Sequence, residues 1–292
     1  MKKILAIMVV LVLFLQGCSS SEDKSMGKEA ETTPTIIATV TSAPTVTSIP
    51  TVAPTDTPAP VLVLPVTVND TGKVLIQTVS GSTTYKTNSY MITSTNGEVI
   101  VVDPTSMPSK DIIDINPAAI MSTHSHPDHT DAKFVSSYPN AQTLLYTDGE
   151  LQTKDFHIYS IKASHGTDTI DGSDYIMVIE VDGLRIAHMG DIGETALTKD
   201  QLKALGKIDI AFMQFENSYS NMSVSNMKGF NIIEQLDPKV IIPTHFGKAS
   251  QELMVERYGE ITNFDNLLEI SKDDLPDKTL NVYMILNKCK YR

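Results

Sequence analysis

Tryptophan is absent from the sequence, cysteine occurs only twice and basic side chains are scarce. The 23 Lys and Arg residues are outnumbered by 35 Asp and Glu residues, giving a formal net charge of -12. Because nucleic-acid binding needs clustered Lys and Arg to neutralise phosphates, no nucleic-acid partner is expected. The cysteines, Cys18 and Cys289, lie at opposite ends of the chain. No stabilising disulfide is therefore expected, and the cysteine count does not indicate a compartment.

Long apolar runs are also missing, apart from one at the start of the chain. Residues 4–15 are all apolar and follow two lysines, but this run is too short to span a bilayer as a helix. It is typical of a signal-peptide core. The run ends in Leu-Gln-Gly-Cys18, which resembles a bacterial lipoprotein cleavage box, although Gln16 is unusual there. We expect a signal peptide at 1–17 and a lipid at Cys18 that anchors an extracytoplasmic protein to the cell-envelope membrane. The alternative is a plain secretory signal with an incidental cysteine.

The following segment, 18–61, is predicted to be a disordered tether. Residues 31–60 contain ten Thr and six Pro and show no apolar period that could form a core. Proline would keep this segment extended. Residues 1–60 carry a net charge of -1, from four Lys against five Asp and Glu, so the remaining residues carry -11. Residues 62–292 are therefore predicted to form one acidic folded domain.

Short apolar runs dominate this domain and helical patterns are interspersed among them, which predicts a mixed α and β fold. Asn96-Gly97 and Asp182-Gly183 mark predicted hairpin turns. Helices are predicted at 131–137 and at 227–236, the second stopped by Asp237-Pro238. Strands are predicted at 74–79, 89–93, 98–102, 118–121, 142–146, 157–163, 175–181, 184–187, 208–212, 240–242 and 280–286.

The stretch MSTHSHPDHT at 121–130 places three of the seven histidines and one aspartate within six residues. His124 and His126 point to one side of an extended chain and can hold one ion, whereas Pro127 can turn Asp128 and His129 toward a second. His165, Asp191 and His245 also follow predicted strands, and strand ends converge on one edge of a layered fold. Imidazole and carboxylate ligands of this mix suit zinc, manganese or iron. The alternative for 124–129 is a polar loop.

The His-x-His-x-Asp-His pattern of 124–129 resembles the signature of the metallo-β-lactamase superfamily. Ser164-His165-Gly166, His188-Met-Gly-Asp191 and Pro243-Thr-His245 match in order, and the resemblance runs from about residue 72 to 287. It implies an αββα four-layer sandwich with two divalent ions, Zn²⁺ with Mn²⁺ or iron as alternatives. The implied ligands are His124, His126 and His165 for one ion, Asp128, His129 and His245 for the other, and Asp191 as a bridge.

Two segments, 182–191 and 239–245, are most similar to the branch that contains ascorbate-6-phosphate lactonase. Thr130-Asp131 stands where glyoxalase II-like enzymes carry glycines, and the step from His124 to His165 is short for a true β-lactamase. Both departures argue against a thioester or β-lactam substrate.

The resemblance implies a hydrolase in which hydroxide shared by two ions attacks a small ester, lactone or phosphodiester. Asp128 would orient the water or move its proton. Asp103 and His188 would support the ligands through hydrogen bonds. The alternatives are an iron-dependent dioxygenase of the same fold and an envelope lipoprotein that binds metal without turnover. Specificity is expected from loops such as 216–224, whose composition is not diagnostic, and the oligomeric state is not indicated.

Overall fold

The computed structural model describes residues 64–84, 86–277 and 280–291. The predicted signal peptide, Cys18 and the predicted tether boundaries lie outside these residues. In chain order the strands are β1 (Val74–Ser82), β2 (Thr87–Thr93), β3 (Val99–Val102), β4 (Ala119–Ser122), β5 (Gln142–Leu145), β6 (Glu150–Gln152), β7 (Phe156–Ala163), β8 (Asp174–Val181), β9 (Leu184–His188), β10 (Ile210–Met213), β11 (Val240–Pro243), β12 (Ile261–Phe264), β13 (Leu267–Ile270) and β14 (Asn281–Ile285). The α-helices are α1 (Ala132–Ser137), α2 (Lys199–Leu205), α3 (Lys228–Leu236) and α4 (Lys248–Tyr258), and the short 3₁₀ helices are η1 (Ser218–Ser220) and η2 (Lys272–Asp274).

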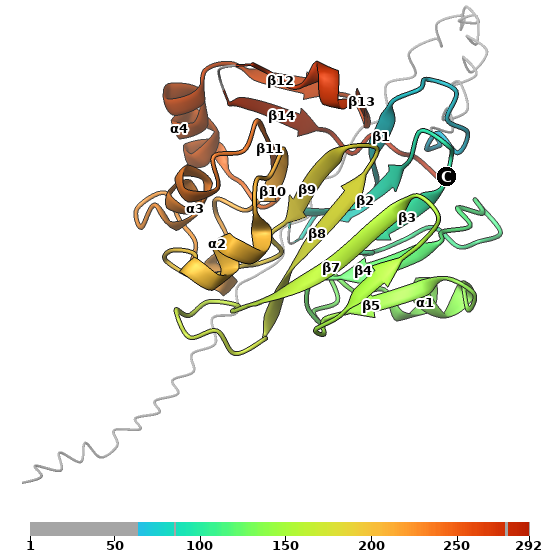
Figure 1. The fold of residues 1–292 in the computed structure, drawn as a ribbon, viewed down its shortest axis with the longest axis horizontal. Helices are drawn as coiled ribbons and strands as arrows, with labels where there is room; N and C mark the ends of the chain where they lie inside the picture. The colour runs from blue at the N-terminus through green and yellow to red at the C-terminus, as the bar shows by residue number, and fades with distance from the viewer. Residues whose placement is uncertain (1–63, 85, 278–279, 292) are drawn as a thin grey trace, which may run out of the picture. The chain divides into compact units, whose positions relative to one another are not determined.

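The strands form two sheets (Figure 1). The six-stranded sheet has the order β13-β1-β2-β3-β4-β5, and the eight-stranded sheet has the order β12-β14-β11-β10-β9-β8-β7-β6. Pairing is parallel for β9, β10 and β11 and antiparallel for β7, β8 and β9.

Alternating side chains of the strands fill three layers of core. Met177 and Ile179 of β8 belong to the cluster between the sheets, whereas Ile176 and Val178 belong to the cluster beneath α2, α3 and α4. Since successive side chains point to opposite faces, a strand covered on both sides is apolar throughout. A third cluster packs Phe134 of α1 against the outer face of the six-stranded sheet. The layers are helix, sheet, sheet and helix, which confirms the predicted αββα sandwich.

The local signals of the sequence account for several element ends. Asp182 and Gly183 have φ of 47° and 79°, and this two-residue turn joins β8 to β9 as predicted. The chain turns at Gly97, whose φ is 86°, between the antiparallel β2 and β3. Asp131 caps α1 by accepting hydrogen bonds from the backbone N–H groups of Lys133 and Phe134. Among the described residues, no helix combines the length and apolar character needed to cross a membrane.

Candidate metal centre

The seven predicted ligands follow the carboxyl ends of strands from both sheets. His124 to His129 come after β4 of the six-stranded sheet, and His165, Asp191 and His245 come after β7, β9 and β11 of the eight-stranded sheet. Both β9 and β11 are parallel to β10, and β7 runs in the direction of β9 because each is antiparallel to β8. The strand directions therefore bring ligands that are far apart in the sequence to one place.

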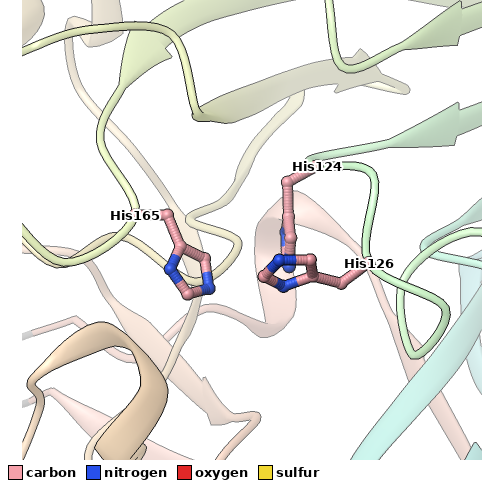
Figure 2. Close-up of side chains that lie close together, drawn as sticks. All are labelled: His124, His126 and His165. Carbon is pink, nitrogen blue, oxygen red and sulfur yellow. The ribbon is translucent and has the colours of Figure 1, made fainter.

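His124, His126 and His165 form a group whose possible ligand atoms all lie within 4.8 Å of one another. In Figure 2, His124 and His126 extend from one loop and the ring of His165 faces them from another. The chain bends at both residues after β4 ends, rather than continuing extended as predicted, and the ring centroids of His124 and His126 lie 4.7 Å apart. Three imidazoles in this arrangement are a ligand set suited to zinc.

Asp191 lies between this group and a second one, formed by His129, Asp191 and His245. Its Oδ2 atom is 3.4 Å from His165 Nε2 and 3.9 Å from His124 Nε2. Its Oδ1 atom is 3.2 Å from His245 Nε2 and 3.5 Å from His129 Nε2. One carboxylate thus presents one oxygen to each set of imidazoles, which is the arrangement that a bridging ligand requires.

Asp128 lies beside the second set of imidazoles. Its Oδ2 atom is 3.8 Å from His129 Nε2, and Asp128, His129 and His124 form a further group within the same 4.8 Å limit. Together the three groups contain all seven predicted ligands.

Several atoms in the centre are buried without a hydrogen-bond partner. They are His124 Nε2, His165 Nε2 and Asp191 Oδ1. Unpartnered buried polar atoms are costly, so three that converge on one place call for a ligand that they share. Nitrogen and carboxylate donors in this mix fit divalent ions such as Zn²⁺.

The opposite nitrogens of two imidazoles are held by buried acids. His129 Nδ1 is 2.7 Å from Asp103 Oδ2, and His124 Nδ1 is 3.3 Å from Asp174 Oδ1. Asp103 also accepts hydrogen bonds from the backbone N–H and hydroxyl of Thr123. A carboxylate on the far nitrogen fixes the ring and leaves Nε2 free to bind metal.

His188 supports the centre from the core side. Its Nδ1 accepts a hydrogen bond from Gly190 N, one residue before Asp191, and lies 3.7 Å from Asp103 Oδ2. Its ring stacks on Phe212, with centroids 5.2 Å apart. The seventh histidine, His157, instead lies on β7, between Glu150 and Glu180.

Three further residues act on the centre and were not indicated by the sequence. Asp174 accepts a hydrogen bond from Asp191 N in addition to its contact with His124. Asn217 Nδ2 donates to Asp191 Oδ2 at 2.7 Å. Glu194 accepts from Ser164 N and so ties the His165 loop to the Asp191 loop. None of these three residues belongs to a recognisable sequence motif, because each lies in a different loop or at the beginning of a strand.

The loops around the centre pack backbone against backbone. Gly193 N donates to Ser164 O at 2.8 Å. A Cβ atom on Gly193 would overlap the backbone N and Cα of Gly166 and would lie 2.7 Å from Ser220 O. Glycine is therefore required at Gly193 for this close approach, which fixes the positions of His165 and Asp191 relative to each other.

Burial and neighbouring charges shift the pKa values of the centre's residues in different directions. Burial disfavours the charged form of His124 and lowers its pKa to about 4. Burial also opposes the charge on His129, but Asp103 outweighs it and raises the His129 pKa to about 9. Burial opposes the charge on Asp191 as well, yet contacts with the imidazoles of His165 and His245 hold its pKa well below the usual range. Asp191 is therefore a carboxylate, as a metal ligand must be. Burial of Glu194 raises its pKa to about 7.

A cavity of about 230 Å³ opens onto the centre. It is lined by His126, Pro127, Asp128, Asp191, Asn217, Tyr219 and His245. Four predicted ligands thus face a space into which a small molecule, or the reactive end of a larger one, can enter.

Residues 83–245, more than half of the chain, match the family model described as a beta-lactamase superfamily domain. The chain belongs to the β-lactamase superfamily. The matched residues include all seven candidate ligands, and His245 is the last residue of the match. Comparison with curated proteins gave no match.

Solved structures with the metallo-β-lactamase fold resemble this chain at low sequence identity. A proposed zinc-dependent hydrolase of the metallo-β-lactamase superfamily from Thermotoga maritima is 18% identical, with a TM-score of 0.52 over 73% of this chain and 99% of that one. A proposed metal-dependent hydrolase from Parabacteroides distasonis is 21% identical, with a TM-score of 0.46 over 68% and 88%. An isothiocyanate hydrolase from Delia radicum gut bacteria is 14% identical, with a TM-score of 0.44 over 64% and 94%. At these identities the likeness concerns the fold alone.

Proposed function

We propose that this protein is a metal-dependent hydrolase that acts on an ester, lactone or phosphodiester bond. The observation that carries the proposal is the convergence of four imidazoles on the two oxygens of Asp191, with His126 grouped beside two of them, next to a cavity and with buried atoms left unpartnered. The resemblance of 182–191 and 239–245 to the ascorbate-6-phosphate lactonase branch supports a lactone among these bonds.

The residues divide into two proposed metal sites. His124, His126 and His165 would hold one divalent ion, Asp128, His129 and His245 the other, and Asp191 both, with Zn²⁺ as the first candidate and Mn²⁺ or iron as alternatives. Divalent ions at such a centre supply Lewis-acid chemistry, because they lower the pKa of water and stabilise negative charge on oxygen.

The protein's own groups would position the reactants and move protons. Asp128 lies at the cavity wall, where its carboxylate can accept a proton from the attacking water. Water adds to the carbonyl carbon or phosphorus, the bond to the leaving oxygen breaks, and that oxygen takes up a proton. Asn217 holds Asp191 in place during this step through its hydrogen bond to Oδ2.

Metal analysis combined with turnover assays tests this function. We expect the purified full-length chain to contain two Zn²⁺ or Mn²⁺ ions and to hydrolyse members of a lactone, ester and phosphodiester panel. His126→Ala should reduce turnover at least about 100-fold, because it removes a ligand. His157→Ala, which alters a histidine outside the centre, should retain both metal and turnover. Full metal occupancy without turnover would instead favour a metal-binding protein, and bound iron with oxygen consumption would favour the dioxygenase alternative.

We also propose that Cys18 is lipidated and holds the domain at an envelope membrane. The apolar run before Cys18 and the Thr- and Pro-rich segment after it support this proposal. On expression in a bacterium that processes lipoproteins, Cys18→Ser should move the protein from the membrane fraction to the soluble fraction. Cys289→Ser is the matched control and should remain with the membranes. Equal membrane association of both variants would rule out the anchor.

A further inference from the structure

Helix α4 begins just after a proposed metal ligand and has no capping side chain of its own. Its first residue, Lys248, lies three positions after His245. Its N-cap residue is Gly247, which has no side chain that could accept a hydrogen bond from the first turn. The N–H groups in the first turn of a helix have no partner within the helix, so α4 needs an acceptor from another segment.

Glu216, from the loop after β10, supplies that acceptor. Its Oε2 atom accepts hydrogen bonds from the backbone N–H of Ser250 at 3.1 Å and from the Ser250 hydroxyl at 2.7 Å. Ser250 is buried and is the third residue of α4, a position whose N–H a capping side chain normally binds. A carboxylate at this end of a helix also interacts favourably with the helix dipole. Glu216 therefore caps α4 from outside the helix.

The backbone around Glu216 holds the second proposed metal site. The N–H groups of Phe215 and Glu216 both donate to His245 O, at 2.7 Å and 3.1 Å. The next residue, Asn217, donates to Asp191 Oδ2 at 2.7 Å. This segment thus contacts two ligands that face each other, since His245 Nε2 and Asp191 Oδ1 are 3.2 Å apart. A shift of α4 away from this segment would therefore alter how His245 faces Asp191.

The contact between Glu216 and α4 is close enough to require glycine at Gly247. A Cβ atom on Gly247 would lie 2.5 Å from Glu216 Oε2 and 3.1 Å from Glu216 Cδ. Gly247 has φ of -128°, which any residue can adopt, so the carboxylate and not the backbone conformation excludes a side chain there. Because the carboxylate ends a flexible side chain, an alanine at Gly247 would displace it from Ser250 rather than move the helix.

We propose that Glu216 is a positioning residue for the second metal site: its carboxylate caps α4 and thereby holds His245 opposite Asp191. This inference rests on the proposed metal-dependent function and adds a residue to it. Glu216 does not line the cavity that opens onto the centre and belongs to none of the three ligand groups found among the described residues. It acts through His245 and not on the substrate.

Competition between the full-length, Zn²⁺-loaded protein and a chromophoric chelator tests the inference. The parent protein should release two ions. In Glu216→Ala we expect the affinity for one ion to fall about 10- to 100-fold, as is typical when a residue that supports a ligand is lost, and the other affinity to stay unchanged. His245→Ala should weaken one ion as well, and adding Glu216→Ala to it should cause no further loss, because Glu216 acts through His245.

Two conservative variants separate the reach of the side chain from its charge. Glu216→Gln keeps the length and one acceptor oxygen, and both hydrogen bonds from Ser250 go to a single oxygen, so this variant should restore most of the affinity. Glu216→Asp keeps the charge but is one methylene shorter, so it should behave like Glu216→Ala.

Gly247→Ala tests the same contact while leaving Glu216 in the chain. It should weaken the same ion, since the added Cβ displaces the carboxylate. In the double variant Glu216→Ala/Gly247→Ala, the second substitution should add nothing, because the three atoms nearest to that Cβ all belong to Glu216. The matched control is Gly259→Ala at the other end of α4, where φ is 88° and nothing lies within 4 Å of an added Cβ. It strains the helix end but should leave both affinities unchanged.

The results distinguish this inference from the function on which it rests. Unchanged affinity for both ions in Glu216→Ala and Gly247→Ala would overturn the inference and leave the metal-dependent function intact. An equal loss in Gly259→Ala would trace the effect to the general stability of α4 and would also overturn it. If Glu216→Ala does not fold, Gly247→Ala decides: loss of one ion supports the inference, and retention of both overturns it. A parent protein that binds fewer than two ions would contradict the two-metal centre itself.

Discussion

Replacing Asp191 with asparagine is expected to remove at least one ion per chain and to lower turnover at least about 100-fold. Asparagine keeps the shape of the side chain but loses its charge, and it turns an amide nitrogen toward one set of imidazoles. The parent oxygens lie 3.2 Å from His245 Nε2 and 3.4 Å from His165 Nε2, and an amide nitrogen in either place has no lone pair with which to bind the ion that those imidazoles would hold. Metal analysis and steady-state kinetics on the same preparation measure both effects.

Asp209→Asn is the matched control for this substitution. Asp209 is also a buried aspartate, but it precedes β10 and accepts hydrogen bonds from Arg185 N and Lys272 Nζ, away from the centre. It should lower stability without changing the metal content. If Asp191→Asn retained two ions and full turnover, Asp191 would not be a bridging ligand.

Gly193→Ala is expected to have the largest effect on stability, lowering the free energy of unfolding by about 3 kcal/mol. The added Cβ would overlap backbone atoms of Gly166 and approach Ser220 O at 2.7 Å. Backbone cannot rotate away as a side chain can, so the loops that carry His165 and Asp191 would have to separate. Urea denaturation measures the loss, and metal content should fall with it.

The control, Gly183→Ala, separates crowding from backbone strain. Gly183 has φ of 79° and nothing within 4 Å of an added Cβ, so the alanine there costs only about 1 kcal/mol for the left-handed conformation. Equal losses for the two variants would contradict the close packing at Gly193.

Most of the fold could be predicted from local pattern. Buried strands such as β8 are apolar on both faces, and Asp182-Gly183 gave the next turn without ambiguity. Elements with weak patterns were not predicted: β6, β12 and β13 are short, and α4 lacks an apolar stripe. For α2 a usable signal existed, because Thr198 and Gln201 form a capping box.

The candidate ligands could be found because metal ligands are chemically distinctive and follow strands. Residues that orient them are ordinary polar side chains, and only the three-dimensional structure shows their partners. In the sequence Asn217 is one of several polar residues in a loop, and only the structure shows its hydrogen bond to Asp191. Asp174 is likewise an acid directly before a predicted strand, and its contacts with His124 and Asp191 appear only in the structure.

Because the ligands come from both sheets, metal binding would affect the stability of the whole domain. Ions held jointly by the loop after β4 and by the loops after β7, β9 and β11 would cross-link the two sheets at one edge of their shared core. A ligand that binds only the folded state adds about 2.7 kcal/mol of stability at one hundred times its Kd. Scarce metal would therefore lower the free energy of unfolding as well as slow the proposed reaction.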